Sequence, residues 1–180
     1  MNAILKPIPV PWSVSPSMSG VTLIHSETYV APECTVILGA NRMSTEGHLE
    51  SCRVDIAFSL SYFAKVGPHN DSESIESIGY TVKDQYEGGA ASYIEWRNRA
   101  WRASGKCLDS GFYVAEHSEW IMTLPPFFHR DFRHYVIDGR DGYVELIARR
   151  FSWKAWLWSS GNRDEAPMKG PVLDSGEEIA

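Results

Sequence analysis

Residues 111–151 read GFYVAEHSEWIMTLPPFFHRDFRHYVIDGRDGYVELIARRF, and this stretch decides the fold. Two of its apolar-rich runs, 133–137 and 143–149, flank the sequence Asp-Gly-Arg-Asp-Gly at 138–142. Asp-Gly pairs supply the positive-φ positions that a tight chain reversal requires. The stretch therefore predicts a β-hairpin, and the run at 112–115 predicts a short strand before it.

Two helical signals lie near the hairpin. Residues 90–104 follow a pair of glycines and end at Gly105, which is a natural terminator, so one amphipathic helix is expected there. Ser118 is placed to cap a second, short helical turn that would run to Leu124. The prolines at 125–126 are expected to stop that turn.

Further strands are expected on both sides. Apolar and smaller residues alternate with a period of two over 53–62, which predicts a strand that ends or bulges near Phe63, before a loop at 67–71. A last strand is expected over 151–158. The sequence thus predicts a mainly β (α+β) fold, in which a curved antiparallel sheet forms a barrel or a sandwich with one main helix.

A single domain is expected for 180 residues that are 43% hydrophobic. Residues 1–20 carry four prolines and several serines, which predicts a flexible arm and no central strand. Residues 159–180 are rich in glycine, proline and acidic side chains, which predicts a flexible acidic tail. The folded β-rich domain would then span 21–158.

Composition excludes some classes of function. A net charge of -6 and a pI of about 5.5 argue against nucleic acid as a partner, because phosphate binding needs clustered Lys and Arg. One basic run exists, between Arg97 and Lys106, and we interpret it as a solvated helix face or a contact for an anion or an acidic partner.

Cysteine usage and hydropathy indicate the compartment. Three widely spaced cysteines suggest neither a disulfide framework nor a zinc site, so reduced thiols in a cytoplasmic protein are expected. No apolar run approaches the roughly 18 residues of a membrane span, so no membrane association is expected. No motif for a cofactor or a metal is found, and none is expected to bind.

Candidate catalytic residues lie in the hairpin. If Ile137 pairs with Tyr143, then Tyr135 lies opposite Glu145, and His134 is on the other face; a shift of one residue changes which of them meet. A carboxylate enclosed beside a phenol would have a raised pKa and could act as an acid or a base. An outward Glu145 and a His134 bonded to a carbonyl in the core are the structural alternatives.

Aromatic residues are concentrated in the same part of the chain. Twelve of the 22 aromatic residues fall between Phe112 and Trp158. They can form the core, a pocket for a flat or apolar ligand, or a patch that binds a protein. The candidates for substrate binding are Trp120, Phe128, Trp153 and Trp156.

Two pieces of this region, FYVAEHSEWI at 112–121 and RHYVIDGRDGYVELIA at 133–148, resemble a pattern in small uncharacterised bacterial β-rich proteins. In that pattern a strand that ends in an E-x-x-S-x-W-I-like turn precedes a hairpin with D-x-x-x-E. The matching positions are Glu116, Ser118, Trp120, His134, Asp141 and Glu145. The resemblance implies that these positions act together, and it implies no particular activity.

Two hypotheses of function follow. The first is a cofactor-independent isomerase, cyclase or lyase that binds a small apolar or aromatic ligand. In it His134 and Glu145 would serve as base and acid, and Tyr135 or Tyr143 would donate a hydrogen bond to an oxyanion. The second is an acidic intracellular interaction module, such as an immunity or inhibitor protein, that covers a basic partner. A homodimer is compatible with either.

Overall fold

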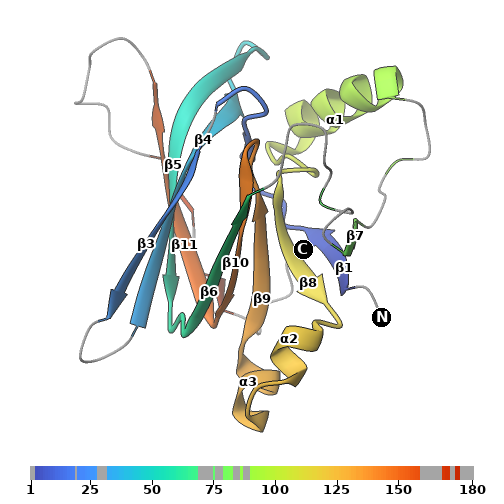
Figure 1. Cartoon of the computed structure of the whole chain (residues 1–180). Coiled ribbons are helices and arrows are strands. Elements are labelled where there is room, and N and C mark those ends of the chain that lie inside the picture. The colour runs from blue at the N-terminus through green and yellow to red at the C-terminus, as the bar shows by residue number, and fades with distance from the viewer. Residues whose placement is uncertain are drawn as a thin grey trace.

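A computed structural model describes residues 3–18, 20–27, 32–68, 75, 79–82, 86, 90–158, 168–170 and 173–174. Its strands form two sheets that pack face to face (Figure 1). The first sheet has the order β6 (Phe63–Pro68), β10 (Gly142–Ala148), β9 (Arg133–Asp138), β8 (Phe112–Glu116), β1 (Ala3–Pro7), β7 (Tyr80–Val82). The second has the order β12 (Met168–Lys169), β11 (Arg150–Leu157), β5 (Leu49–Ser59), β4 (Pro32–Met43), β2 (Trp12–Val14); β3 (Val21–Glu27) also pairs with β4, and β13 (Leu173–Asp174) with β11.

The predicted mainly β fold is confirmed, and the sheets form a sandwich that does not close into a barrel. Among the described strands, β1 pairs with β7 in parallel and the other pairings are antiparallel. The main core lies between the sheets and takes buried side chains from both. Helix α1 (Ala90–Ser104) lies at one end of the sandwich, and α2 (Glu119–Met122) and α3 (Pro126–Asp131) lie at the other (Figure 1).

The predicted hairpin is confirmed, but its register differs by one residue from the pairing assumed above. Tyr143 pairs with Asp138, and Glu145 pairs with Val136. The reason is a tighter turn, in which the N–H of Gly139 donates to the carbonyl of Gly142 at 2.9 Å. Because side chains alternate along a strand, the shift puts Glu145 on the same face as His134.

The strand predicted over 53–62 is confirmed as β5, which turns Val54, Ile56 and Phe58 into the core. It ends at Ser59, and Leu60 then adopts a left-handed conformation with φ 56°. The chain crosses at this point to the first sheet and continues as β6.

The prediction that a loop begins at Gly67 is wrong, because β6 continues through Pro68. The ring of Tyr143 covers Gly67 so closely that a Cβ there would lie 2.2 Å from a ring carbon. This glycine therefore serves side-chain packing within a strand and does not mark a turn. The rest of the predicted loop, residues 69–71, lies outside the described residues.

The expected flexible arm is wrong for the described residues between 3 and 18. β1 lies inside the first sheet, between β8 and β7, and Trp12 in β2 is fully buried. Pro7 ends β1, while Pro9 and Pro11 fall in the link that passes from one sheet to the other. The prolines therefore occupy positions where they interrupt few ladder hydrogen bonds.

The expected tail is described only in part. Met168–Lys169 and Leu173–Asp174 both pair with β11, so this segment adds two short strands. Residues 159–167, 171–172 and 175–180 lie outside the described residues.

The predicted helices are confirmed. α1 ends as expected at Gly105, whose φ is 70° and whose N–H donates to the carbonyl of Trp101 at 2.8 Å. Ser118 caps α2 by accepting a hydrogen bond from the N–H of Ile121. α3 was not predicted; Pro126 begins it, because proline is tolerated in a first helical turn. None of these helices is long and apolar enough to cross a membrane.

Candidate functional site

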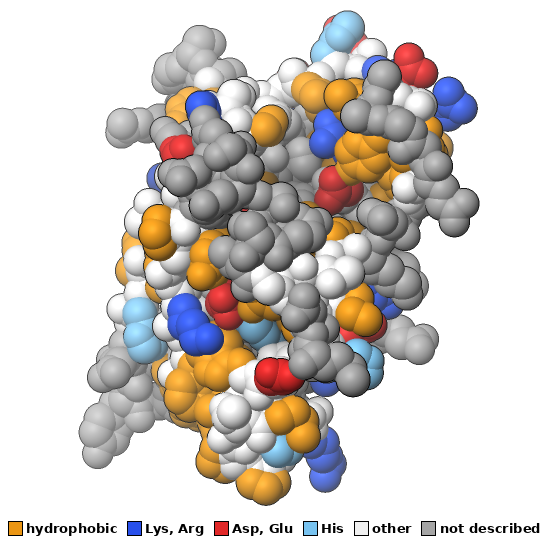
Figure 2. All heavy atoms as spheres, turned by 45° about the vertical axis from the view of Figure 1, so that its right-hand side comes forward, with side chains coloured by type: hydrophobic (Ala, Val, Ile, Leu, Met, Phe, Trp, Pro, Cys, Tyr) orange, Lys and Arg blue, Asp and Glu red, His pale blue; other side chains and the backbone are white. Residues whose placement is uncertain are grey.

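His134 and Glu145 lie on the outer face of the first sheet, away from the core between the sheets. Only 2% of the His134 surface and 7% of the Glu145 surface is exposed. Figure 2 turns this side of the molecule toward the viewer and shows basic, acidic and histidine side chains close together above a broad hydrophobic area. Two ionisable groups are thus held close together almost out of water, where their interaction is strong.

His134 bridges a hydroxyl and a carboxylate. Its Nδ1 lies 2.8 Å from the Oγ of Ser118, and its Nε2 lies 3.2 Å from the Oε2 of Glu145. The second contact has the distance of an ion pair but lacks the alignment of a full hydrogen bond. Since Ser118 Oγ already accepts from the N–H of Ile121, its own proton is available to Nδ1. The arrangement therefore favours the tautomer with the ring proton on Nε2, facing Glu145.

Three more side chains complete what we call the His134 cluster: Lys65, Tyr80 and Trp120. The rings of Trp120 and Tyr80 meet His134 at centroid distances of 5.1 and 6.1 Å. Lys65 Nζ lies 3.7 Å from Glu145 Oε2 and 3.7 Å from the centre of the Trp120 ring. The Lys65 side chain is 52% exposed, so it forms the outer edge of the cluster.

The cluster keeps Glu145 charged. Burial by itself would raise the pKa of this carboxyl group, but the contacts with His134 and Tyr80 and the charge of Lys65 outweigh burial and lower the pKa. Burial, together with the neighbouring Glu145 carboxylate, raises the pKa of Tyr80. Glu145 is therefore a carboxylate at neutral pH and Tyr80 remains a hydrogen-bond donor.

Replacing Glu145 with Gln should destabilise the protein by about 1–3 kcal/mol at neutral pH and by less in acid. A lowered folded pKa gives stability that is fully present above the ordinary value of 4.5 and is lost as the pH falls through the lowered value. Denaturant unfolding of both proteins across that pH range measures the difference. Glu46→Gln, at an exposed position, should stay within about 0.5 kcal/mol of wild type throughout. A pH-independent effect of Glu145→Gln would contradict the assignment.

The two tyrosines predicted as catalytic, Tyr143 and Tyr135, lie on opposite faces of the first sheet. Tyr143 shares the outer face with Glu145 and lies over Gly67, and burial raises its pKa, as does Glu145. Tyr135 points the other way, into the core against Phe58 and Phe151, so its predicted contact with Glu145 is wrong. The one-residue difference in register is the reason.

The four aromatic candidates lie in four different places. Trp120 contacts His134. Phe128 belongs to a small core beneath α3, Trp153 packs against Trp12 between the sheets, and Trp156 lies beside Arg53 on the second sheet. The four therefore do not line one pocket.

Sequence reasoning missed part of the cluster. Lys65 follows the break in alternation after β5, and Tyr80 lies in a strand of three residues, so neither carries a periodic signal. Ser118 was identified only as a cap and as a position of the resemblance. Of the six resemblance positions, the structure brings together Ser118, Trp120, His134 and Glu145, whereas Glu116 and Asp141 are exposed at the end of β8 and in the hairpin turn.

The cysteines are poor candidates for catalysis. Burial raises the pKa of the Cys34 and Cys52 thiols to about 11 and that of Cys107 to about 12, so all three stay protonated at neutral pH. Within the described ranges, no three side chains of the His, Cys, Asp and Glu types are placed to hold a metal ion.

Comparison with known proteins identifies no relative. No protein-family model matches the chain, and neither the curated proteins nor the solved structures contain a significant match. A proposal of function therefore rests on the geometry of the His134 cluster.

Proposed function

We propose that this protein is a cofactor-independent acid–base enzyme whose proton-transfer machinery is the His134 cluster. One observation carries the proposal: a nearly buried imidazole faces a hydroxyl with one nitrogen and a charged carboxylate with the other. Nucleophile–base–acid triads are recognised by this division of roles, whichever ring nitrogen serves each partner.

The proposed roles follow from the contacts. His134 is the base and takes up a proton through the Ser118 hydroxyl at Nδ1. Glu145 orients the ring and stabilises the imidazolium that forms. Lys65 and Tyr80 are donors beside Glu145 and would stabilise an oxyanion that develops on a substrate.

The aromatic surroundings support an apolar or aromatic substrate. Trp120 borders both His134 and Lys65, and behind it lies the small core of Phe63, Phe128 and other apolar side chains. Because Lys65 Nζ lies over the Trp120 ring, an aromatic compound bound at the edge of Trp120 would bring a carbonyl substituent near Lys65. Isomerase, cyclase and lyase reactions of carbonyl compounds can all begin with removal of a proton beside the carbonyl, and this is the step that His134 would catalyse.

A ligand screen tests the proposal. Small aromatic and alicyclic carbonyl compounds are added to protein with labelled histidine side chains, and the ring resonances of His134 are followed by NMR. Compounds that shift them should bind at least about tenfold more weakly to Trp120→Ala, because stacking area is lost. Trp158→Ala, at a position 60% exposed on the second sheet, is the control and should bind as wild type. The proposal fails if no compound shifts these resonances.

An interaction module is the second candidate. It is supported by the net charge of -6 and by exposed apolar side chains, with Met122 64%, Phe127 59% and Trp158 60% exposed. The same screen separates the two candidates. A protein that only covers a basic partner would leave His134 unmoved by every small ligand.

A further inference from the structure

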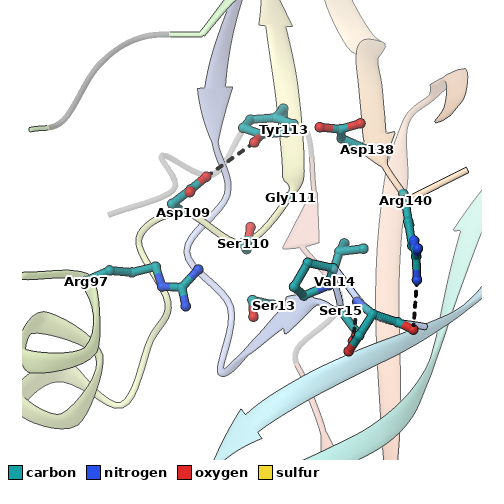
Figure 3. A pocket seen from close by; sticks show the side chains of 13 residues that line it. Ser13, Val14, Ser15, Arg97, Asp109, Ser110, Gly111, Tyr113, Asp138 and Arg140 are labelled. Atoms are coloured by element: carbon teal, nitrogen blue, oxygen red, sulfur yellow. Dashed lines mark hydrogen bonds between the residues drawn. The ribbon is translucent and has the colours of Figure 1, made fainter. Parts of the chain in front are cut away.

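A cleft that shares no residue with the His134 cluster lies where the link after β2 passes the beginning of β8 and the turn of the β9–β10 hairpin. Its volume is about 570 Å³, which is within the range of small-molecule sites. Figure 3 shows the side chains that converge on it from α1, from the segment before β8 and from the hairpin.

Two cationic side chains line this cleft among the described residues, Arg97 on one wall and Arg140 on the other. Arg97 extends from α1, and its guanidinium points toward Ser13 and Ser110 (Figure 3). Its Nε is buried and has no hydrogen-bond partner in the described part of the chain. Because Nε is closed off, the guanidinium meets the cleft through its two terminal nitrogens. An unpaired guanidinium is costly, so an acceptor in the cleft is expected to bind these nitrogens.

The neighbouring acid does not supply that acceptor. Asp109 also lines the cleft, but its two carboxylate oxygens accept hydrogen bonds from the hydroxyls of Tyr93 and Tyr113. The ion pairs among the described residues join other side chains, and none includes Arg97 or Asp109. The phenols therefore hold the carboxylate, and the guanidinium fork stays directed at the cleft.

The charges around the cleft define the ligand. A guanidinium fork beside the Ser13 hydroxyl suits the two oxygens of a carboxylate. Asp109 and Asp138 on the walls would repel a dianion, whereas they attract hydroxyl or ammonium hydrogens. Arg140 lines the wall that faces Arg97 and donates a long hydrogen bond, 3.5 Å, to the carbonyl of Ser17. We propose that this cleft binds a small monocarboxylate that carries a hydroxyl or ammonium group, anchored by Arg97.

Calorimetric titration of the whole protein with lactate, alanine and inorganic phosphate tests the assignment. Lactate or alanine should bind at millimolar concentration or below, and phosphate more weakly, because it carries more charge past the two aspartates. Arg97→Gln should weaken the carboxylate by about 10- to 100-fold, since a charge-assisted pair of hydrogen bonds is lost.

Two variants serve as controls. Arg97→Lys keeps the charge without the planar fork and should bind with intermediate affinity. Arg99→Gln, at an exposed position of the same helix that does not line the cleft, should bind as wild type. The proposal is overturned if neither carboxylate binds, if phosphate binds more tightly than both, or if Arg97→Gln and Arg99→Gln bind alike. Because this site shares no residue with the His134 cluster, none of these results bears on the proposed enzyme.

Discussion

Replacing Trp12 with Ala is expected to lower the free energy of unfolding by about 3–5 kcal/mol. The indole is fully buried between the sheets, stacks on Phe112 at a centroid distance of 6.0 Å and meets Trp153 edge-on at 6.3 Å. Its removal leaves a large cavity that the surrounding rings can only partly fill. Domains of this size are stable by about 5–15 kcal/mol, so the variant should be close to unfolding. Denaturant unfolding followed by circular dichroism measures the change.

Two comparisons make the Trp12 experiment decisive. Trp158→Ala removes the same side chain from an exposed position and should change stability by no more than about 0.5 kcal/mol. Trp12→Phe should cost much less than Trp12→Ala, because a ring remains and because it removes a buried indole N–H that has no acceptor among the described residues. A loss below about 1 kcal/mol for Trp12→Ala would mean that the N-terminal segment is not part of the core.

The Trp12 segment also shows where sequence reasoning fails. Period-two alternation predicted β5, and glycine and capping signals predicted the hairpin, α1 and α2, because those signals act within a few residues. Trp12 lies among prolines, and its indole is buried against Phe112 in β8 and Trp153 in β11, which are distant in the sequence. This segment is part of the fold because of tertiary contacts, and no local sequence pattern predicts such contacts.

The candidate site was predictable only in part, because its residue types are visible in the sequence and its long-range contacts are not. The residue types of His134 and Glu145 identify them as a candidate pair, but whether they share a face depends on a hairpin turn that is one residue shorter than assumed. Tyr135 faces the core, and the one-residue difference in register puts Glu145 on the opposite face, beside His134. Lys65 and Tyr80 join them through the pairing of β6 with β10 and through the position of β7, and no local pattern reports either arrangement.

Once a substrate is found, His134→Gln is expected to lower turnover by about 10²- to 10⁴-fold while the protein stays folded. Glutamine keeps a polar group of similar reach between Ser118 and Glu145, but it cannot take up and release a proton. Ser118→Ala should cause a loss of similar size if the hydroxyl carries the proton to Nδ1, since the two groups then act as one unit. Steady-state kinetics across pH measures both variants.

The combination of variants separates catalysis from packing. In a proton relay the double variant His134→Gln with Ser118→Ala should be about as slow as either single variant, because removing one member already breaks the path. If both residues only supported the fold, the loss of turnover would follow the loss of stability of each variant. It would then disappear at low temperature, where each variant is folded. His48→Gln, at an exposed position in the β4–β5 turn, is the control and should keep full turnover. A folded His134→Gln protein with wild-type turnover would remove His134 from the mechanism, and Glu145, which acts only through it, would lose its proposed role as well.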